Sequence, residues 1–212
     1  MRILAIADIH GVPIVYEWLV GLTGAVDAVI LAGDLFAGDD APRQQIQALE
    51  IVEKLRESSA PVLYIMGNDD NVALGVEDEV IKPIQGQRVE IREYSFVGYQ
   101  YTPPFVGDTF VKPEEEIAAD LRLLAPLVDQ RTVLVTHAPA FGSLDMVRGE
   151  KVGSRAIADF LLQHPVLAHV HGHVHERFGR DGNHFNVAAA GRCRAVLIDL
   201  PSLQHEVVVQ PL

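Results

Sequence analysis

Short apolar runs of strand length, each ended by a glycine or a polar residue, restrict the fold of this 212-residue chain more than any other feature. In the first half, three such runs lie at residues 3–7, 28–32 and 61–65. Amphipathic segments separate them, and the second of these carries Ile46, Leu49, Val52 and Leu55 at helical spacing. Uniformly apolar strands that alternate with helices are typical of a parallel sheet with both faces covered. The first half therefore predicts βαβ units.

The second half of the chain is richer in strands. Short strands are expected at residues 88–91, 96–99, 132–135, 167–170, 185–188, 195–198 and 206–209. One helix is expected over residues 115–124, and another begins after the N-cap Ser154. With no repeat and no linker-like stretch, residues 1–212 are expected to form a single domain. We predict an α/β fold in which two mixed β-sheets pack face to face with helices on the outside, a four-layer αββα sandwich.

Composition limits the possible partners and compartments. The net charge of -12 argues against binding of duplex nucleic acid through a broad basic surface, so a small substrate is expected. No apolar stretch reaches the roughly 20 residues of a membrane span, so no membrane contact is expected. The apolar run after Met1 is too short for a signal sequence, and the single Cys193 suits a reducing compartment. We therefore expect a cytoplasmic protein.

Metal-ligand residue types stand where the predicted strands end. They fall in five segments, whose members are Asp8 and His10, Asp34, Asn68, His137, and the pair His173 and His175. In an extended segment, the alternation of side chains would place both histidines of the last pair on one side. Mixed carboxylate, amide and imidazole donors suit Mn, Fe, Zn, Ni or Co, whereas an all-oxygen set would suggest Mg or Ca. The sequence therefore predicts two divalent transition-metal ions.

These five segments resemble, in the same order, the signature blocks of calcineurin-like metallophosphoesterases of the small single-domain prokaryotic type. The blocks read Asp-Ile-His at 8–10, Gly-Asp at 33–34, Gly-Asn at 67–68, Thr-His-Ala-Pro at 136–139 and Gly-His-Val-His at 172–175. A weaker likeness continues into residues 186–191. Any one block is weak evidence, but five blocks in order, each at a predicted strand end, are strong evidence.

The resemblance implies a role for each ligand. The first metal would be held by Asp8, His10, Asp34 and His175, and the second by Asp34, Asn68, His137 and His173. Asp34 would bridge the two ions, and a hydroxide between them would be the nucleophile. The catalytic group would comprise Asp34, Asn68, Asp69 and His137, and the reaction would be hydrolysis of small phosphodiesters or activated phosphate esters.

Asp69 departs from the family pattern. Many members carry histidine after the asparagine of the third block, and that histidine is taken to protonate the leaving oxygen. With an unperturbed pKa near 3.9, an aspartate is a poor acid at neutral pH unless burial raises that pKa. A preference for diesters or activated esters over alkyl monoesters is therefore expected.

Other roles remain open for several residues. Taken singly, Asp8, Asp34 and Asn68 could be turn or cap residues, and Asp69 and Asp70 could cap a short following helix. His169 and His171 are expected in the core or behind the ligands, and three other histidines are expected at the surface, namely His164, His184 and His205. Residues 101–105 are expected to form a rigid turn or a pocket wall. Residues 142–153, which include Arg148 and Lys151, are expected to form a solvated loop or to reach over the site.

Two alternative functions are kept. A catalytically silent interaction scaffold would retain the fold without turnover, as the small retromer subunit of this superfamily does, but lost ligands would mark it. A phosphomonoesterase or protein phosphatase is the second alternative. Protein phosphatases usually continue the second block to an Asp-Arg-Gly segment, and residues 35–40 read Leu-Phe-Ala-Gly-Asp-Asp instead.

Overall fold

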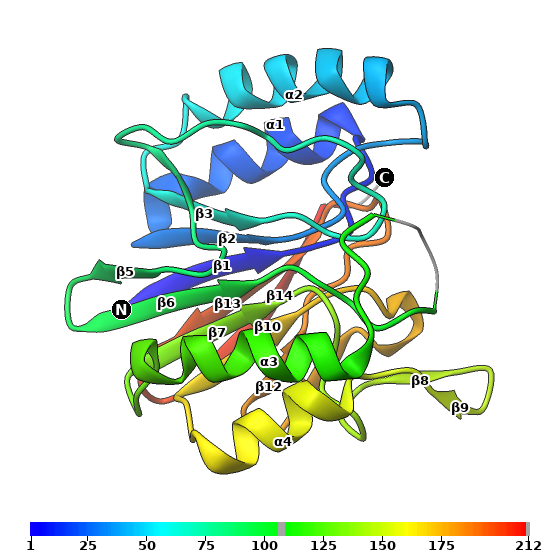
Figure 1. The fold of residues 1–212 in the computed structure, drawn as a ribbon. Helices are drawn as coiled ribbons and strands as arrows, with labels where there is room; N and C mark the ends of the chain where they lie inside the picture. Colours follow the sequence, from blue (N-terminus) through cyan, green and yellow to red (C-terminus); the bar gives the residue numbers. More distant parts are fainter. Residues whose placement is uncertain (106–108, 211–212) are drawn as a thin grey trace.

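The computed structural model describes residues 1–105 and 109–210. Its centre is a pair of six-stranded mixed sheets, with two long helices on the outer face of each (Figure 1). This arrangement confirms the predicted four-layer αββα sandwich.

The first sheet contains the opening βαβ units. Its strand order is β14-β13-β1-β2-β3-β4. The strands are β1 (Arg2–Ile6), β2 (Ala28–Ala32), β3 (Val62–Ile65), β4 (Ile81–Pro83), β13 (Arg194–Asp199) and β14 (Gln204–Val209). The first four run parallel to one another, and β13 and β14 pair antiparallel at the other edge.

The second sheet has the order β11-β12-β10-β7-β6-β5. Its strands are β5 (Arg88–Ile91), β6 (Tyr94–Tyr99), β7 (Thr132–Thr136), β10 (Ala168–His171), β11 (Gly179–Asp181) and β12 (His184–Asn186). The four inner strands are parallel, and the edge strands β5 and β11 are antiparallel to their neighbours. The carboxyl ends of parallel strands meet at one edge of a sheet, so this topology gathers the residues that follow them.

Helices α1 (Pro13–Leu22) and α2 (Ala41–Leu55) cover the first sheet, and α3 (Glu114–Leu124) and α4 (Arg155–Gln163) cover the second (Figure 1). The predicted cap is confirmed, because the Ser154 hydroxyl accepts a hydrogen bond from the Ile157 amide. Three short 3-10 turns complete the helical elements, namely η1 (Thr23–Ala25), η2 (Ala125–Leu127) and η3 (His175–Arg177).

The buried face of α2 differs from the expected one. Ile46 and Leu49 are 62% and 64% exposed, while Ala48, Val52 and Leu55 pack inward. A stripe that advances by three residues at every step rotates by about 180° over nine residues, because a helical turn holds 3.6. The two ends of such a stripe cannot both face the sheet, so only its C-terminal part is buried.

An apolar layer between the two sheets holds them together. Ile3, Ile30 and Leu63 of the first sheet face Val135 and Phe185 of the second, and all are fully buried. Burial of apolar surface stabilises the contact between the two sheets, at roughly 25 cal/mol per Å². The sheet edge on which the polar residues gather is therefore firmly supported.

Residues 142–153 form more structure than the solvated loop that was expected. Within them, β8 (Met146–Val147) and β9 (Glu150–Lys151) pair as a hairpin that projects from the body of the molecule (Figure 1). Arg148 and Gly149 at its tip both have positive φ, as a two-residue hairpin turn requires. The Asp145 carboxylate anchors the base by accepting hydrogen bonds from the amides of Gly142 and Gly153.

Candidate metal centre

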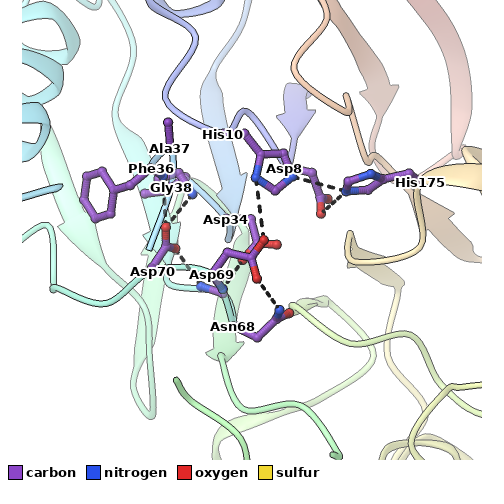
Figure 2. Close-up of polar contacts among 12 residues, drawn as sticks. Asp8, His10, Asp34, Phe36, Ala37, Gly38, Asn68, Asp69, Asp70 and His175 are labelled. Carbon is purple, nitrogen blue, oxygen red and sulfur yellow. Dashed lines mark hydrogen bonds and ion pairs between the residues drawn. The ribbon is translucent and has the colours of Figure 1, made fainter. Parts of the chain in front are cut away.

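All seven predicted ligands lie at one end of the sandwich, where β1, β2, β3, β7 and β10 finish. Figure 2 shows Asp8, His10, Asp34 and His175 turned toward one another across the ends of the strands. The structure thus brings together residues that are up to 167 positions apart in the chain.

Asp8, His10 and His175 form the first group of ligand atoms. The Nε2 atoms of His10 and His175 are 3.3 Å apart, and Nε2 of His175 is 3.0 Å from Oδ1 of Asp8. One ligand atom from each residue lies within 4.8 Å of the other two. The second carboxylate oxygen of Asp8 accepts a hydrogen bond of 3.0 Å from the His173 amide, which fixes the orientation of the carboxylate.

Asp34, Asn68 and His137 form the second group. Nε2 of the fully buried His137 is 3.0 Å from Oδ1 of Asn68 and 3.3 Å from Oδ2 of Asp34. On its other side, Nδ1 of His137 is 2.8 Å from the carbonyl oxygen of Ala32, to which it donates. A backbone partner on one ring nitrogen leaves the other free as a ligand, the usual arrangement of metal-binding histidines.

Asp34 joins the two groups. It shares one cluster of ligand atoms with Asp8 and His137, and another with His10 and Asp69. This proximity to both groups is compatible with the bridging role that the resemblance implies, and bridging stays a prediction.

His173 reaches the site by a different route from the expected one. Strand β10 ends at His171, His173 has a φ of 69°, and His175 opens the turn η3. The pair therefore converges through a turn, and the expectation of simple alternation along an extended strand is wrong. Nε2 of His173 is buried and has no hydrogen-bond partner among the described residues.

Strained backbone concentrates at these ligands. Asp8, His10, Asp34 and His173 all adopt positive φ, between 51° and 69°. For residues other than glycine such conformations cost on the order of 1–3 kcal/mol each, and they are held only where the surroundings enforce them. The strain shows that the fold specifies the direction of these side chains.

Three glycines of the sequence blocks leave room for the ligands. A Cβ atom at any of them would collide with a ligand side chain. The pairs are Gly33 with His137, Gly67 with Asp34, and Gly172 with Asp8. Each glycine is thus needed for the close approach of a ligand to the neighbouring backbone.

Burial and charge oppose one another at the buried ligands. Burial disfavours the imidazolium of His137, but the Asp34 carboxylate beside it raises the pKa of His137 to about 10. Burial likewise disfavours the charged form of Asp34, yet His137 holds the pKa of that carboxyl below its usual range. For His173, burial and the neighbouring His137 lower the pKa to about 4, which favours the neutral ring that binds metals.

Asp69 lies at the mouth of the site. Its carboxylate accepts a hydrogen bond of 2.8 Å from the Asn68 amide group, and its other oxygen is 3.8 Å from Nδ1 of His10 (Figure 2). Burial and the charge of Asp34 raise the pKa of Asp69. The side chain is within reach of a substrate, but a cation bound beside it would oppose this shift.

Asp70 has a structural role that the sequence reading missed. No helix follows it, so the expected cap is wrong. Its fully buried carboxylate accepts hydrogen bonds from the amides of Leu35 at 2.8 Å, Phe36 at 3.0 Å and Gly67 at 2.8 Å. Figure 2 shows Asp70 beside Asp69 and Phe36, where it ties the loop after β2 to the loop after β3.

Gln44 was also missed, because a glutamine within a helix carries no signal of its own. It is fully buried on α2, and its amide group donates to the carbonyl oxygens of Gly38 and Asp69. Its own side-chain oxygen accepts from the Asn71 amide at 2.6 Å. Helix α2 is thereby joined to the loop that presents Asn68.

A cavity of about 460 Å³ opens directly above the ligands. Its floor includes Asp34, Asn68 and His173, and its walls include Phe105 and Arg148. The Phe105 ring lies edge-on to His173 at 6.1 Å between centroids. Both segments whose reach was left open, residues 101–105 and 142–153, therefore contribute to the cavity.

The other histidines sort as follows. His169 and His171 are fully buried behind the site, as expected. His205 is exposed, as expected. His184 is half-buried and not at the surface as expected, and its Nδ1 lies 2.9 Å from Nδ1 of the buried His169. His164 is also half-buried and packs against Phe160.

The donor set fits divalent transition metals. It combines carboxylate and amide oxygens with imidazole nitrogens. His173, whose buried Nε2 has no hydrogen-bond partner among the described residues, lines the cavity and lies beside His137 at 5.2 Å between ring centroids. An unpaired polar atom in a buried place is costly, and Nε2 of His171 is also buried without a partner among the described residues. His173 differs from His171 because it lines the cavity.

Comparison with known proteins identifies the family. Residues 1–177 match the calcineurin-like phosphoesterase family. The chain belongs to this family, whose members hydrolyse phosphoric esters and typically bind divalent metals.

Individual proteins resemble this chain in sequence or in fold. UPF0046 protein K07C11.7 of Caenorhabditis elegans is 30% identical over 116 residues, which cover 52% of this chain and 39% of that protein. The match therefore spans less than half the length of this relative. The structure of TT1561 of Thermus thermophilus has a TM-score of 0.75 at 18% identity and covers 98% of both chains.

Two larger enzymes share the fold. They are the purple acid phosphatase PPD1 of yellow lupin, with a TM-score of 0.56 at 12% identity, and the 5'-nucleotidase of Candida albicans, with 0.54 at 11%. The alignments cover 93% and 92% of this chain but only 49% and 47% of those chains.

No helix among the described residues is long and apolar enough to cross a membrane.

Proposed function

We propose that this protein is a dinuclear metal-dependent phosphoesterase that hydrolyses small phosphodiesters or activated phosphate esters. The observation that carries the proposal is the gathering of candidate ligands at one cavity, which Asp34, Asn68, His173 and His175 line. Asp34 also shares clusters of ligand atoms with Asp8 and His137 and with His10 and Asp69. Each of the five family blocks supplies a residue of the required type.

The ligands divide as the family pattern implies. Asp8, His10 and His175 would hold one ion, and Asn68, His137 and His173 would hold the other. Asp34 would contact both, because a carboxylate between two dications offsets their mutual repulsion. When bound, two such ions polarise the phosphate and lower the pKa of a coordinated water toward neutrality.

The chain itself supplies orientation and a shaped cavity. The Ala32 carbonyl fixes the tautomer of His137, and the His173 amide fixes the rotation of the Asp8 carboxylate. Phe105 and Val147 present apolar surface beside the ligands, where the organic part of an ester can pack. The substrate is thereby held with its phosphate toward the floor of the cavity.

The expected preference for diesters or activated esters over alkyl monoesters rests on Asp69. A leaving alkoxide needs a proton, and Asp69 is a weaker source of it near neutral pH than the histidine found in many relatives. An activated ester such as a nitrophenyl ester needs little help. Substrates with good leaving groups should therefore be turned over faster than alkyl monoesters.

The compartment and partners are proposed on composition. A net charge of -12 disfavours duplex nucleic acid, and the buried free thiol of Cys193 suits a reducing cytoplasm. Mn is proposed as the first candidate among the metal ions. Residues 1–212 are proposed to form one domain.

Turnover of bis(4-nitrophenyl) phosphate tests the function. Protein stripped with a chelator should be inactive, and added Mn should restore hydrolysis, with an alkyl phosphate monoester cleaved more slowly. Protein that binds two Mn ions per chain and hydrolyses neither ester would favour the scaffold alternative. Faster release of phosphate from a phosphoserine peptide than from the diester would favour the protein phosphatase alternative.

A further inference from the structure

The segment that follows β12 crosses from the second sheet to the first, directly behind the ligands. The Val187 amide donates to the carbonyl oxygen of His171 in the second sheet at 2.8 Å. The Ala7 amide, just beyond β1, donates to the Val187 carbonyl at 3.0 Å, and the Ala189 amide donates to the Ala7 carbonyl at 2.8 Å. These bonds join the end of β1, where Asp8 follows, to the end of β10.

Asn186 begins this crossing and is fully buried. Its Nδ2 donates to the carbonyl oxygen of Val174 at 2.8 Å, and its Oδ1 accepts from the Ala188 amide at 3.0 Å. Both bonds of its side chain are therefore made to backbone. One partner lies in the crossing, and the other lies in the turn that carries the last two ligands.

The partner residue Val174 stands between His173 and His175. Because β10 stops at His171, no strand pairing within residues 1–105 and 109–210 includes this turn. Other bonds hold its flanks, from the Gly172 amide to the His137 carbonyl at 3.1 Å and from the His173 amide to the Asp8 carboxylate at 3.0 Å. The Val174 carbonyl at the centre of the turn accepts hydrogen bonds from Nδ2 of Asn186 at 2.8 Å and from the Arg177 amide, within η3, at 3.2 Å. Of these two donors, only Asn186 comes from outside the turn and η3.

The crossing is held from a second side by Arg194. Its guanidinium donates to the Ala188 carbonyl at 2.6 Å and lies 3.9 Å above the Phe178 ring, just after η3. The Ala188 peptide is thus bonded through its amide to Asn186 and through its carbonyl to Arg194. The backbone to which the Asn186 side-chain oxygen is bonded is therefore itself held in place.

We propose that Asn186 is a positioning residue that sets the distance between His175, in the turn after β10, and Asp8, which follows β1, and so tunes metal affinity. This inference rests on the proposed function, since it assigns the role of these ligands. Hydrogen-bonded groups behind metal ligands typically change metal affinity by about 10–100-fold when removed. Loss of the Asn186 amide group should therefore weaken metal binding without removing a ligand.

Asn186→Asp provides the test, with Asn183→Asp as the matched control. The substitution preserves shape but places a carboxylate oxygen against the Val174 carbonyl. Asn183 is a nearby half-buried asparagine whose Nδ2 donates to the Val166 carbonyl at 3.2 Å, away from the site. Both variants add one negative charge, which by itself would strengthen the binding of a cation.

Mn titration of the metal-free proteins, followed by electron paramagnetic resonance, gives the main readout. We expect Asn186→Asp to bind Mn about 10–100-fold more weakly than wild type, and Asn183→Asp to bind at least as tightly as wild type. Hydrolysis by Asn186→Asp should recover when Mn is raised. Hydrogen exchange at residues 172–175 of the metal-free Asn186→Asp protein should be faster than in the control.

Unchanged Mn affinity in a folded Asn186→Asp protein would overturn the inference, and so would equal weakening in the Asn183→Asp control. If Asn186→Asp fails to fold, Asn186→Ala replaces it, with Asn183→Ala as its control and the same outcomes. Failure of wild-type protein to bind two Mn ions would instead refute the proposed function, so the two failures are distinguishable.

Discussion

Replacing Asp70 by asparagine should lower the free energy of unfolding and weaken metal binding, although every proposed ligand remains in the chain. The carboxylate accepts three backbone hydrogen bonds, from Leu35 and Phe36 through Oδ1 and from Gly67 through Oδ2. Asparagine keeps one acceptor oxygen, so its amide group must face the third donor. A buried donor left without a partner costs about 1–3 kcal/mol, and we expect that loss in the free energy of unfolding.

Urea denaturation of the metal-free proteins, followed by circular dichroism, measures this loss. Burial and the charge of Asp34 raise the pKa of Asp70 to about 8, so the comparison is made near pH 9, where the wild-type carboxylate is ionised. Mn affinity of Asp70→Asn should also fall, because the loops that carry Asp34 and Asn68 are no longer tied together.

Asp78→Asn is the control for this substitution. Asp78 also accepts two backbone hydrogen bonds, from Val80 at 2.9 Å and Ile81 at 2.8 Å, and pairs with Arg56 at 3.1 Å. It is half-buried and belongs neither to the clusters of ligand atoms nor to the lining of the cavity. Its replacement should destabilise the protein less and leave Mn affinity unchanged. Equal Mn affinity in Asp70→Asn and wild type would refute the reasoning.

Three further predictions follow from the arrangement of the site. His173→Ala should lose bound Mn by elemental analysis, whereas His171→Ala should retain it; equal loss from both would mean that the two histidines have been assigned to the wrong roles. Asp69→His, compared with wild type at equal metal content, should raise hydrolysis of esters with poor leaving groups more than that of nitrophenyl esters, because histidine supplies a proton near neutral pH; equal changes on both would favour a structural role for Asp69. Burial lowers the pKa of His169 well below 6.5. Below about pH 6.5, the unfolded chain therefore binds a proton at His169 that the folded chain does not. The stability that is present above pH 6.5 is lost as the pH falls below it. In denaturant titrations of metal-free protein below about pH 6.5, the stability of His169→Gln should therefore fall less steeply than that of wild type, by up to about 1.4 kcal/mol per pH unit, and an unchanged slope would contradict a buried neutral His169.

The gathering of the candidate ligands at one edge could be predicted from the sequence because of the sheet topology. Asp8, Asp34 and Asn68 follow strands that lie parallel in one sheet, and His137 follows a parallel strand of the other. Parallel strands bring their carboxyl ends to one edge, so residue types at strand ends suffice to locate a site. The same logic predicted the sandwich from the spacing of its strands.

The geometry around the last block could not be predicted in this way. His173 adopts positive φ after β10 has ended, and a periodic pattern carries no information on such a turn. Asp70 was misread because an aspartate that caps a helix and one that accepts amides from a distant loop look alike in sequence. Only the packing of the loop after β2 against the loop after β3 distinguishes them.

The hairpin of β8 and β9 was missed for a different reason. Each strand has two residues, too few for any alternation to be detected. Its position depends on long-range bonds, such as that from the Arg177 guanidinium to the Met146 carbonyl at 3.1 Å. Part of the cavity wall, including Arg148, therefore emerged only from the folded chain.

Anomalous scattering from a crystal of the Mn-loaded protein tests the central claim most directly. We expect two peaks roughly 3.5–4 Å apart, one beside Asp8, His10 and His175 and the other beside His137 and His173, with Asp34 between them. A single peak, or two peaks that do not share Asp34, would contradict the dinuclear centre on which the proposed chemistry depends.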